Sequence, residues 1–142
     1  MTTIEYIPFH KNCKTIVNVG ELQITPDGVG CKTNEYLMVM YFACKTREEM
    51  QEIQDNGFQP TDGVLGKGVY MFPSYSEAAA ISDRYIIFTR ITKGRCKELL
   101  PRELPGFDPK GFDRAVLVDN GVETNCIYNI AVIDVIAFIE FE

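Results

Sequence analysis

The stretch that decides the fold is residues 57–81, GFQPTDGVLGKGVYMFPSYSEAAAI. Its first part is a short polar loop with glycines at positions 57, 63, 66 and 68, and the loop leads directly into an apolar strand. Glycine allows backbone N–H and C=O groups to approach a ligand closely, because it has no Cβ. Tyr70 lies near the junction of loop and strand, where its ring can line a pocket. The alternative interpretation is a β-hairpin or bulge with a core tyrosine.

The length of 142 residues predicts one domain with a hydrophobic core. The hydrophobic fraction of 46% and the aromatic fraction of 11% are typical of a globular chain. No apolar run approaches the roughly 20 residues of a membrane span, and the N-terminus does not have the pattern of a signal peptide. The net charge of −6 argues against non-specific binding to nucleic acid. We therefore expect a cytoplasmic protein that binds neither membrane nor nucleic acid.

Cysteine and histidine usage predicts reduced thiols and no metal site. The five cysteines include no C-x-x-C pair, and the single histidine, His10, offers no zinc-ligand spacing. His10 is expected to be exposed or to cap an element. Cys44, Cys96 and Cys126 lie in or beside apolar segments, so we expect them in the core.

Strands dominate the predicted secondary structure. They are expected at Ile4–Phe9, Thr15–Val19, Leu22–Thr25, Tyr36–Cys44, Arg84–Thr92, Arg114–Val118, Thr124–Tyr128 and Val132–Phe141. Residues 36–44 form a continuous apolar run and predict a buried central strand. Pro26-Asp27-Gly28 predicts a turn, and the residues 97–112, rich in proline, glycine and charge, predict a loop.

Two helices are predicted by capping chemistry. Thr46 can cap a helix whose Glu49 reaches back, and Asn56-Gly57 ends it. Ser74 and Glu77 repeat this spacing before a short helix through residues 78–81. The fold class is therefore α+β, and rich in β-structure.

Two nucleotide-binding motifs are excluded. A P-loop needs four residues between its glycines and a hydroxyl residue after the lysine, whereas here Gly63 and Gly66 are too close and Gly68 follows Lys67. A dinucleotide-binding fingerprint opens a helix, whereas this loop opens a strand.

Several segments in order resemble the catalytic core of PARP-type ADP-ribosyltransferases. They are Tyr41-Phe42-Ala43-Cys44-Lys45-Thr46, Asn56-Gly57-Phe58, Gly66-Lys67-Gly68-Val69-Tyr70-Met71-Phe72, Ser76-Glu77-Ala78, Arg90–Arg95, Gly111-Phe112-Asp113 and Glu123–Val135. The nearest resemblance is to the small, single-domain, virus-induced PARP-like proteins of fish. It implies a PARP-like fold with a split antiparallel or mixed sheet. A core at residues 35–142 would follow an N-terminal β-rich extension at residues 1–34, within the single domain 1–142.

The resemblance implies chemistry on NAD⁺, whose nicotinamide–ribose bond the family cleaves through an oxocarbenium-like transition state. A histidine contacts the adenosine ribose, a glycine holds the nicotinamide amide by its backbone, a tyrosine stacks on the ring, and a glutamate stabilises positive charge.

These roles transfer unevenly to this chain. The stacking tyrosine falls on Tyr70, and the helix serine and second tyrosine fall on Ala78 and Ile81. The histidine falls on Ala43, or on Phe42 with one gap, and the clamping glycine then falls on Cys44 or on Ala43. The catalytic glutamate falls on Thr124. Glu123 is adjacent but points to the opposite face of a strand, unless a bulge turns it inward. Gly68 and Tyr75 complete the set expected to line the NAD⁺ site.

Three hypotheses follow. The first is a PARP-like protein with a degenerate His-Tyr-Glu motif, weak or inactive in catalysis, that acts by binding protein, NAD⁺ or ADP-ribose, in antiviral innate defence as the fish resemblance implies. The second is an active mono-ADP-ribosyltransferase that modifies a protein substrate. The third is a β-rich domain unrelated to NAD⁺. Loss of the histidine and the glutamate favours the first, and the intact glycine loop with Tyr70 supports the second.

Overall fold

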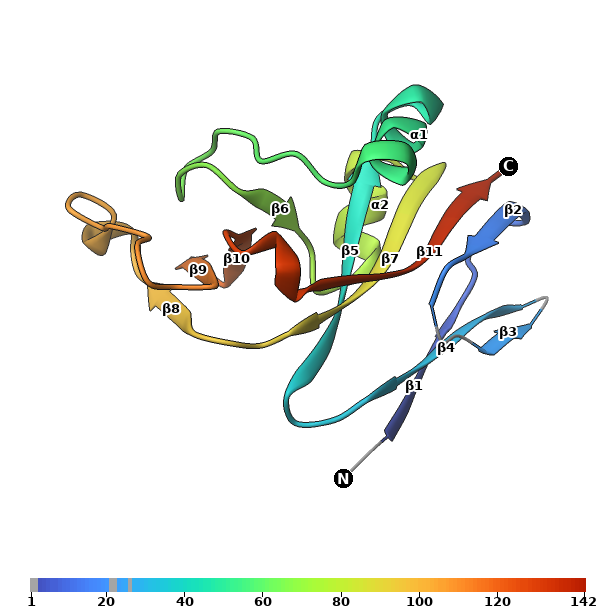
Figure 1. Cartoon of the computed structure of the whole chain (residues 1–142), viewed down its shortest axis with the longest axis horizontal. Coiled ribbons are helices and arrows are strands. Elements are labelled where there is room, and N and C mark those ends of the chain that lie inside the picture. The colour runs from blue at the N-terminus through green and yellow to red at the C-terminus, as the bar shows by residue number, and fades with distance from the viewer. Residues whose placement is uncertain (1–2, 21–22, 26) are drawn as a thin grey trace.

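The computed structural model describes residues 3–20, 23–25 and 27–142. These residues form eleven strands, two α-helices and two short 3₁₀ turns. The prediction of a β-rich α+β chain with two short helices is therefore confirmed. The strands form three sheets, which contain antiparallel pairs and one parallel pair (Figure 1).

The largest structural unit is an antiparallel four-stranded sheet. Its order is β2 (Cys13–Asn18), β11 (Ile133–Phe141), β7 (Tyr85–Thr92) and β5 (Leu37–Cys44). A second four-stranded sheet has the order β6 (Val69–Met71), β10 (Val122–Ile127), β9 (Arg114–Asp119) and β8 (Cys96–Leu99), with β8 parallel to β9. The third sheet contains β1 (Thr3–Pro8), β4 (Gly28–Thr33) and β3 (Gln23–Thr25), with β4 in the middle.

Strand β5 is buried on both faces, yet it lies at the edge of its sheet. Val39 and Tyr41 enter the hydrophobic cluster on one face, while Met40 and Cys44 enter the cluster on the other. This alternation follows from the two-residue period of a strand. The prediction of a central strand is wrong in this respect, because β5 pairs fully with β7 alone.

Both helices have the N-cap residues that the sequence predicts, and α1 also ends at its predicted glycine. The Glu49 N–H donates to Thr46 Oγ1 over 3.1 Å at the start of α1 (Arg47–Asn56), and Gly57 ends the helix with a φ of 82°. Ser74 Oγ accepts the N–H of Glu77 at the start of α2 (Tyr75–Ile81), which begins three residues earlier than expected.

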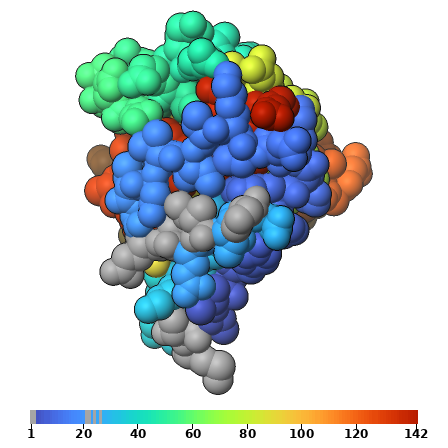
Figure 2. All heavy atoms as spheres, turned by 90° about the vertical axis from the view of Figure 1, so that its right-hand side faces the viewer, coloured from blue at the N-terminus to red at the C-terminus, as the bar shows by residue number. Residues whose placement is uncertain are grey.

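The helices lie on opposite faces of the β2–β11–β7–β5 sheet. Met50 and Ile53 of α1 pack against Met40 and Ile87, whereas Ala78 of α2 joins Tyr41 and Phe88 in the other cluster. The N-terminal strands cover a large part of one side of the molecule, as Figure 2 shows. Within them, β2 extends the large sheet, while β1, β4 and β3 form a separate sheet that packs through Val29 on the α2 side.

Two segments differ from the sequence prediction. Residues 97–112 are not wholly a loop, because they contain most of β8 and a 3₁₀ turn, η1 (Pro101–Glu103). Strand β4 was not predicted. The expected strand Leu22–Thr25 and the turn at Pro26 fall partly outside the described residues, and the described part of that strand is β3. A second 3₁₀ turn, η2 (Ile130–Val132), precedes β11.

Candidate functional site

The two four-stranded sheets are joined by a single backbone bridge, and beyond it they separate. Tyr41 N–H donates to Phe72 O over 2.8 Å, and Phe72 N–H donates to Tyr41 O over 2.9 Å. Only this pair bridges β5 to the β6 side in the described part of the chain. Two residues further on, Ala43 of β5 and Tyr70 of β6 stand at the edges of the diverging strands.

The backbone of Ala43 points into this gap. In an antiparallel pair, neighbouring residues alternately direct their N–H and C=O groups toward and away from the partner strand. Tyr41 directs both groups to Phe72, and the β5–β7 register is regular, so Phe42 and Cys44 bond to β7 while Ala43 faces away. The described residues show no backbone partner for Ala43 outside the β5–β7 ladder. The strand edge therefore offers one donor and one acceptor side by side.

The glycine loop closes on the outer edge of β6. Thr61 and Gly68 exchange backbone hydrogen bonds of 2.8 and 3.0 Å. Tyr70 enters this loop from β6: its hydroxyl donates to Gly66 O over 2.6 Å and accepts the N–H of Leu65 over 3.0 Å. Tyr128 donates its hydroxyl to Leu65 O over 2.6 Å. Burial of the ring is the main cause that raises the pKa of Tyr70 to about 12.

Contacts or backbone conformation within the fold explain why three positions of the loop are glycine. A Cβ at Gly63 would collide with the Tyr70 ring, and a Cβ at Gly68 would lie 2.5 Å from Cys126 Sγ. Gly66 has a φ of +95°, which L side chains rarely adopt. The interpretation as a β-bridge loop around a partly buried tyrosine accounts for these glycines without a ligand.

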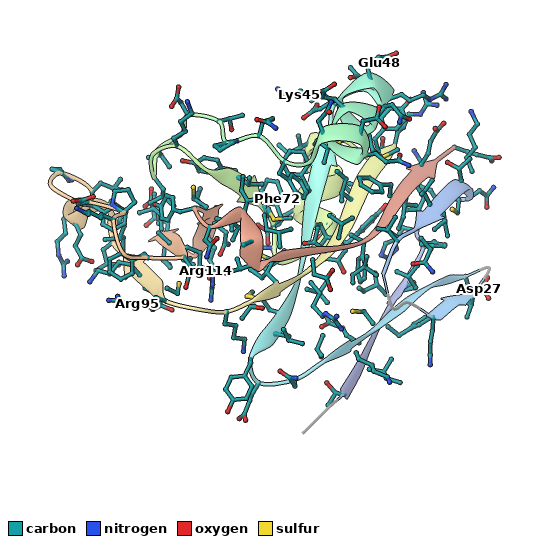
Figure 3. The ribbon with its side chains drawn as sticks, viewed as in Figure 1. Asp27, Lys45, Glu48, Phe72, Arg95 and Arg114 are labelled. Carbon is teal, nitrogen blue, oxygen red and sulfur yellow. The ribbon has the colours of Figure 1, made fainter. Side chains whose placement is uncertain are left out.

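An open cleft lies where the strands diverge, with a volume of about 640 Å³. This is within the range of about 300–1,000 Å³ that is usual for ligand sites. Figure 3 labels Lys45, which lies beside the start of α1, and Phe72, which lies beside β6. The lining residues are Phe42, Ala43, Lys45, Glu49, Thr61, Asp62, Gly63, Val64, Tyr70, Phe72, Ile81 and Thr124.

Five of the ten residues that the sequence analysis predicted for the NAD⁺ site line this cleft. They are Phe42, Ala43, Tyr70, Ile81 and Thr124. Ile81 comes from the end of α2, and the other four come from β5, β6 and β10. The Tyr41–Phe72 bridge and the β6–β10 pairing hold these three strands together.

The other five lie outside the cleft, each for a structural reason. Tyr75 and Ala78 belong to the cluster on the α2 side of the sheet, where the Tyr75 ring lies 6.0 Å from those of Tyr41 and Phe141. Cys44 is fully buried toward α1, and burial raises the pKa of its thiol to about 12. Gly68 packs against β10.

Glu123 is exposed and does not line the cleft. A bulge could have turned it inward, but β10 pairs with β9 in unbroken register from Val122 to Ile127. Thr124 alone therefore presents its side chain to the cleft from this part of β10, with a hydroxyl rather than a carboxylate.

Several lining residues were not identified from the sequence, and they supply all the charges of the cleft. Lys45 contributes a positive charge, and Glu49 and Asp62 contribute negative ones. The capping pattern at Thr46 predicted that Glu49 reaches back, and it does so one residue further than a capping box requires, because Glu49 Oε2 accepts the N–H of Lys45 over 2.9 Å rather than that of Thr46. That same reach carries the carboxylate to the β5 edge.

Among residues 3–20, 23–25 and 27–142, no group of three or more His, Cys, Asp or Glu is arranged to hold a metal ion. No helix in the described part of the chain is long and apolar enough to cross a membrane. All five cysteines are free thiols, and His10 is exposed beside the Tyr75 ring. Comparison with models of known protein families finds no match, and comparison with curated proteins finds none that is significant.

Proposed function

We propose that the chain is a PARP-like, ADP-ribosyltransferase-fold protein whose cleft binds the nicotinamide end of NAD⁺, and that it transfers ADP-ribose weakly or not at all. The observation that supports this proposal most directly is the backbone of Ala43 at the edge of β5, whose N–H and C=O face away from β7 toward the cleft that Tyr70 also lines. A primary carboxamide has one acceptor and adjacent N–H donors, so it complements the N–H and C=O groups of one strand residue.

The walls of the cleft suit a planar ring. Phe42, Tyr70 and Phe72 each line it, and a pyridinium ring that carries positive charge is attracted to aromatic faces. The Tyr70 hydroxyl is engaged by Leu65 and Gly66, which fixes the ring. With Ala43 at the clamping position and Phe42 at the histidine position, the gapped alignment of the family motif agrees with the lining of the cleft.

Weak catalysis follows from the side chains at two positions. Phe42 has no hydrogen-bonding group for a ribose, and the Thr124 hydroxyl has no negative charge with which to stabilise an oxocarbenium-like transition state. Glu123 is exposed in a regular strand and lies outside the cleft. We therefore infer a role in binding NAD⁺, ADP-ribose or a protein partner. Because the sequence resembles the virus-induced proteins of fish, we propose that this role belongs to antiviral defence in the cytoplasm.

Active mono-ADP-ribosyl transfer to protein is the second candidate, and one observation favours it. Glu49 and Asp62 bring two carboxylates to the same cleft from α1 and from the glycine loop. A carboxylate that reaches the ribose from either element could supply the charge that Thr124 does not.

Calorimetric titration with NAD⁺ tests binding, and the variant Ala43→Pro tests its site. Proline removes the one N–H that the clamp requires, and it is tolerated at an edge strand where that N–H is not part of the ladder. Ala43→Ser is the matched control, because it changes the side chain and retains the N–H. We expect saturable binding in the wild type and in Ala43→Ser, and its loss in Ala43→Pro. No heat at millimolar NAD⁺ would refute the proposal.

A second assay separates the two candidates. Incubation with labelled NAD⁺ should leave the protein unmodified and the NAD⁺ intact if the chain only binds. Release of nicotinamide together with covalent labelling of the protein, both abolished by Glu49→Gln or Asp62→Asn, would instead establish the transferase.

A further inference from the structure

The carboxylate of Glu49 is held at the edge of β5 by two contacts at the start of α1. Its Oε2 accepts the Lys45 N–H over 2.9 Å, and its own N–H donates to Thr46 Oγ1 over 3.1 Å. The side chain is partly buried and lines the cleft. The described residues show no hydrogen-bond partner for Oε1, which leaves one carboxylate oxygen for a ligand.

The position of Glu49 along the edge follows from strand geometry. The Cys44 carbonyl points to β7, so the next N–H, that of Lys45, points to the cleft side together with the groups of Ala43. Residues two apart on a strand are separated by roughly 6.6 Å. Along the edge, a ligand therefore meets the Ala43 N–H, then the Ala43 C=O, and then the Glu49 carboxylate.

This order of donor, acceptor and carboxylate has a defined complement. A primary carboxamide bound to Ala43 through its oxygen and one N–H has a second N–H, which points onward along the strand. An amidinium group has N–H donors but no acceptor for the Ala43 N–H, and a carboxylate group has no donor and is repelled by Glu49. Charge-assisted hydrogen bonds are roughly twice as strong as neutral ones.

Glu49 determines the sign of the net charge of the side chains that line the cleft. Lys45 and Asp62 also line it, and their unit charges of opposite sign offset each other. The negative charge of Glu49 remains, and it is the one fixed by a backbone hydrogen bond at the β5 edge.

We infer that Glu49 is a specificity-determining residue of the cleft, and that it selects planar aromatic ligands with a primary carboxamide over those with a carboxylate. This inference rests on the proposed binding of nicotinamide at Ala43. It adds a third recognition group, a side-chain carboxylate from α1.

Three isosteric probes test the inference with the full-length chain: benzamide, benzamidine and benzoate. In the wild type we expect benzamide to bind at least about tenfold more tightly than benzoate, which Glu49 repels, and more tightly than benzamidine, which cannot accept the Ala43 N–H. In Glu49→Gln the ratio of benzamide to benzoate affinities should fall about tenfold, because the repulsion and the charge-assisted hydrogen bond are both lost. Glutamine can still accept the Lys45 N–H and preserve the cap, so the helix remains intact.

Glu48→Gln is the matched control, because it removes the same charge from the same helical turn outside the cleft. It should leave the ratio of benzamide to benzoate affinities unchanged. If benzamide binds, is lost in Ala43→Pro, and shows the same ratio in wild type and Glu49→Gln, the role of Glu49 is refuted while the nicotinamide site stands. If none of the three probes binds the wild type, both proposals fail.

Discussion

Glu140 of β11 accepts two hydrogen bonds from the guanidinium of Arg47, the first residue of α1. Nε donates to Oε1 over 3.2 Å and a terminal nitrogen donates to Oε2 over 2.8 Å. Lys14 of β2 lies 3.2 Å from the same carboxylate and Arg84, just before β7, lies 4.0 Å from it. Glu140 is only 5% exposed. One carboxylate thus ties α1 to the β2–β11–β7 part of the sheet.

This contact predicts a pH dependence of stability. The hydrogen bonds from Arg47, followed by that from Lys14, lower the pKa of Glu140. Its stabilising contribution is therefore fully present above the ordinary glutamate pKa of about 4.3 and is lost as the pH falls through the lowered value.

Urea unfolding of wild type and Glu140→Gln between pH 7 and pH 3 measures this contribution. The wild type should be more stable at pH 7, and the difference should shrink toward pH 3. Glu123→Gln, at an exposed position of β10, should show no such trend. A difference between wild type and Glu140→Gln that stays constant with pH would contradict the prediction.

The alternation of backbone groups along β5 predicts unequal losses of stability from proline at neighbouring positions. Ala43→Pro removes an N–H that faces the cleft, so the free energy of unfolding should fall by no more than about 1 kcal/mol. Cys44→Pro removes an N–H of the β5–β7 ladder and leaves the carbonyl of its partner Tyr85 unpaired, which costs about 1–3 kcal/mol beyond the effect of Cys44→Ala. Chemical denaturation of the three variants measures both values. Equal losses at both positions would mean that Ala43 is not at a free edge.

The fold could be predicted from the sequence wherever the structure depends on local chemistry. Thr46 and Ser74 cap their helices through bonds within four residues, and such contacts are visible as spacing. Strand β8 was missed because its four residues, Cys96–Leu99, do not alternate between polar and apolar side chains, and its partner β9 follows only after a long connection. Strand β4 was missed because Gly28 and Gly30 are poor strand formers, although Gly28 is required there, since a Cβ would collide with the Ile7 carbonyl and the Tyr6 ring.

The site was predictable only in part, for a different physical reason. Its geometry arises where β5 and β6 separate beyond the Tyr41–Phe72 bridge, and no local pattern specifies how two strands diverge. Tyr75 and Ala78 were expected at the site because they follow the motif in order, but α2 turns them toward the opposite face of the sheet. The capping pattern predicted a bond of Glu49 at the start of α1, but no local pattern predicted that its carboxylate lines the cleft. The other walls of the cleft are brought there by the fold.

Burial divides the five thiols into two groups. Cys31, Cys44 and Cys126 are buried, while Cys13 and Cys96 are partly exposed. Burial raises the pKa of all five thiols, that of Cys44 to about 12, so the buried ones are doubly protected from alkylation. Iodoacetamide at pH 8 should modify Cys13 and Cys96 first in native protein, and all five in urea, as peptide mass spectrometry would show. Modification of native Cys44 as fast as that of Cys13 would contradict its placement.

The packing of Gly63 against Tyr70 can be measured by a double-mutant cycle. Gly63→Ala places a methyl group against the ring and should cost about 1–3 kcal/mol. Tyr70→Leu removes the hydroxyl that bonds to Leu65 and Gly66 and should cost a similar amount. In the double variant the clash has no partner, so the combined loss should be smaller than the sum by about 1 kcal/mol or more.

Val64→Ala is the control for this cycle, because Val64 is exposed in the same loop and its truncation should be nearly neutral. Additive losses for Gly63→Ala and Tyr70→Leu would mean that the glycine is not required by the ring. The glycine would then be available for close approach to a ligand, as the first interpretation of the loop held. A coupled loss would show that Gly63 is needed to seat the Tyr70 ring in the loop.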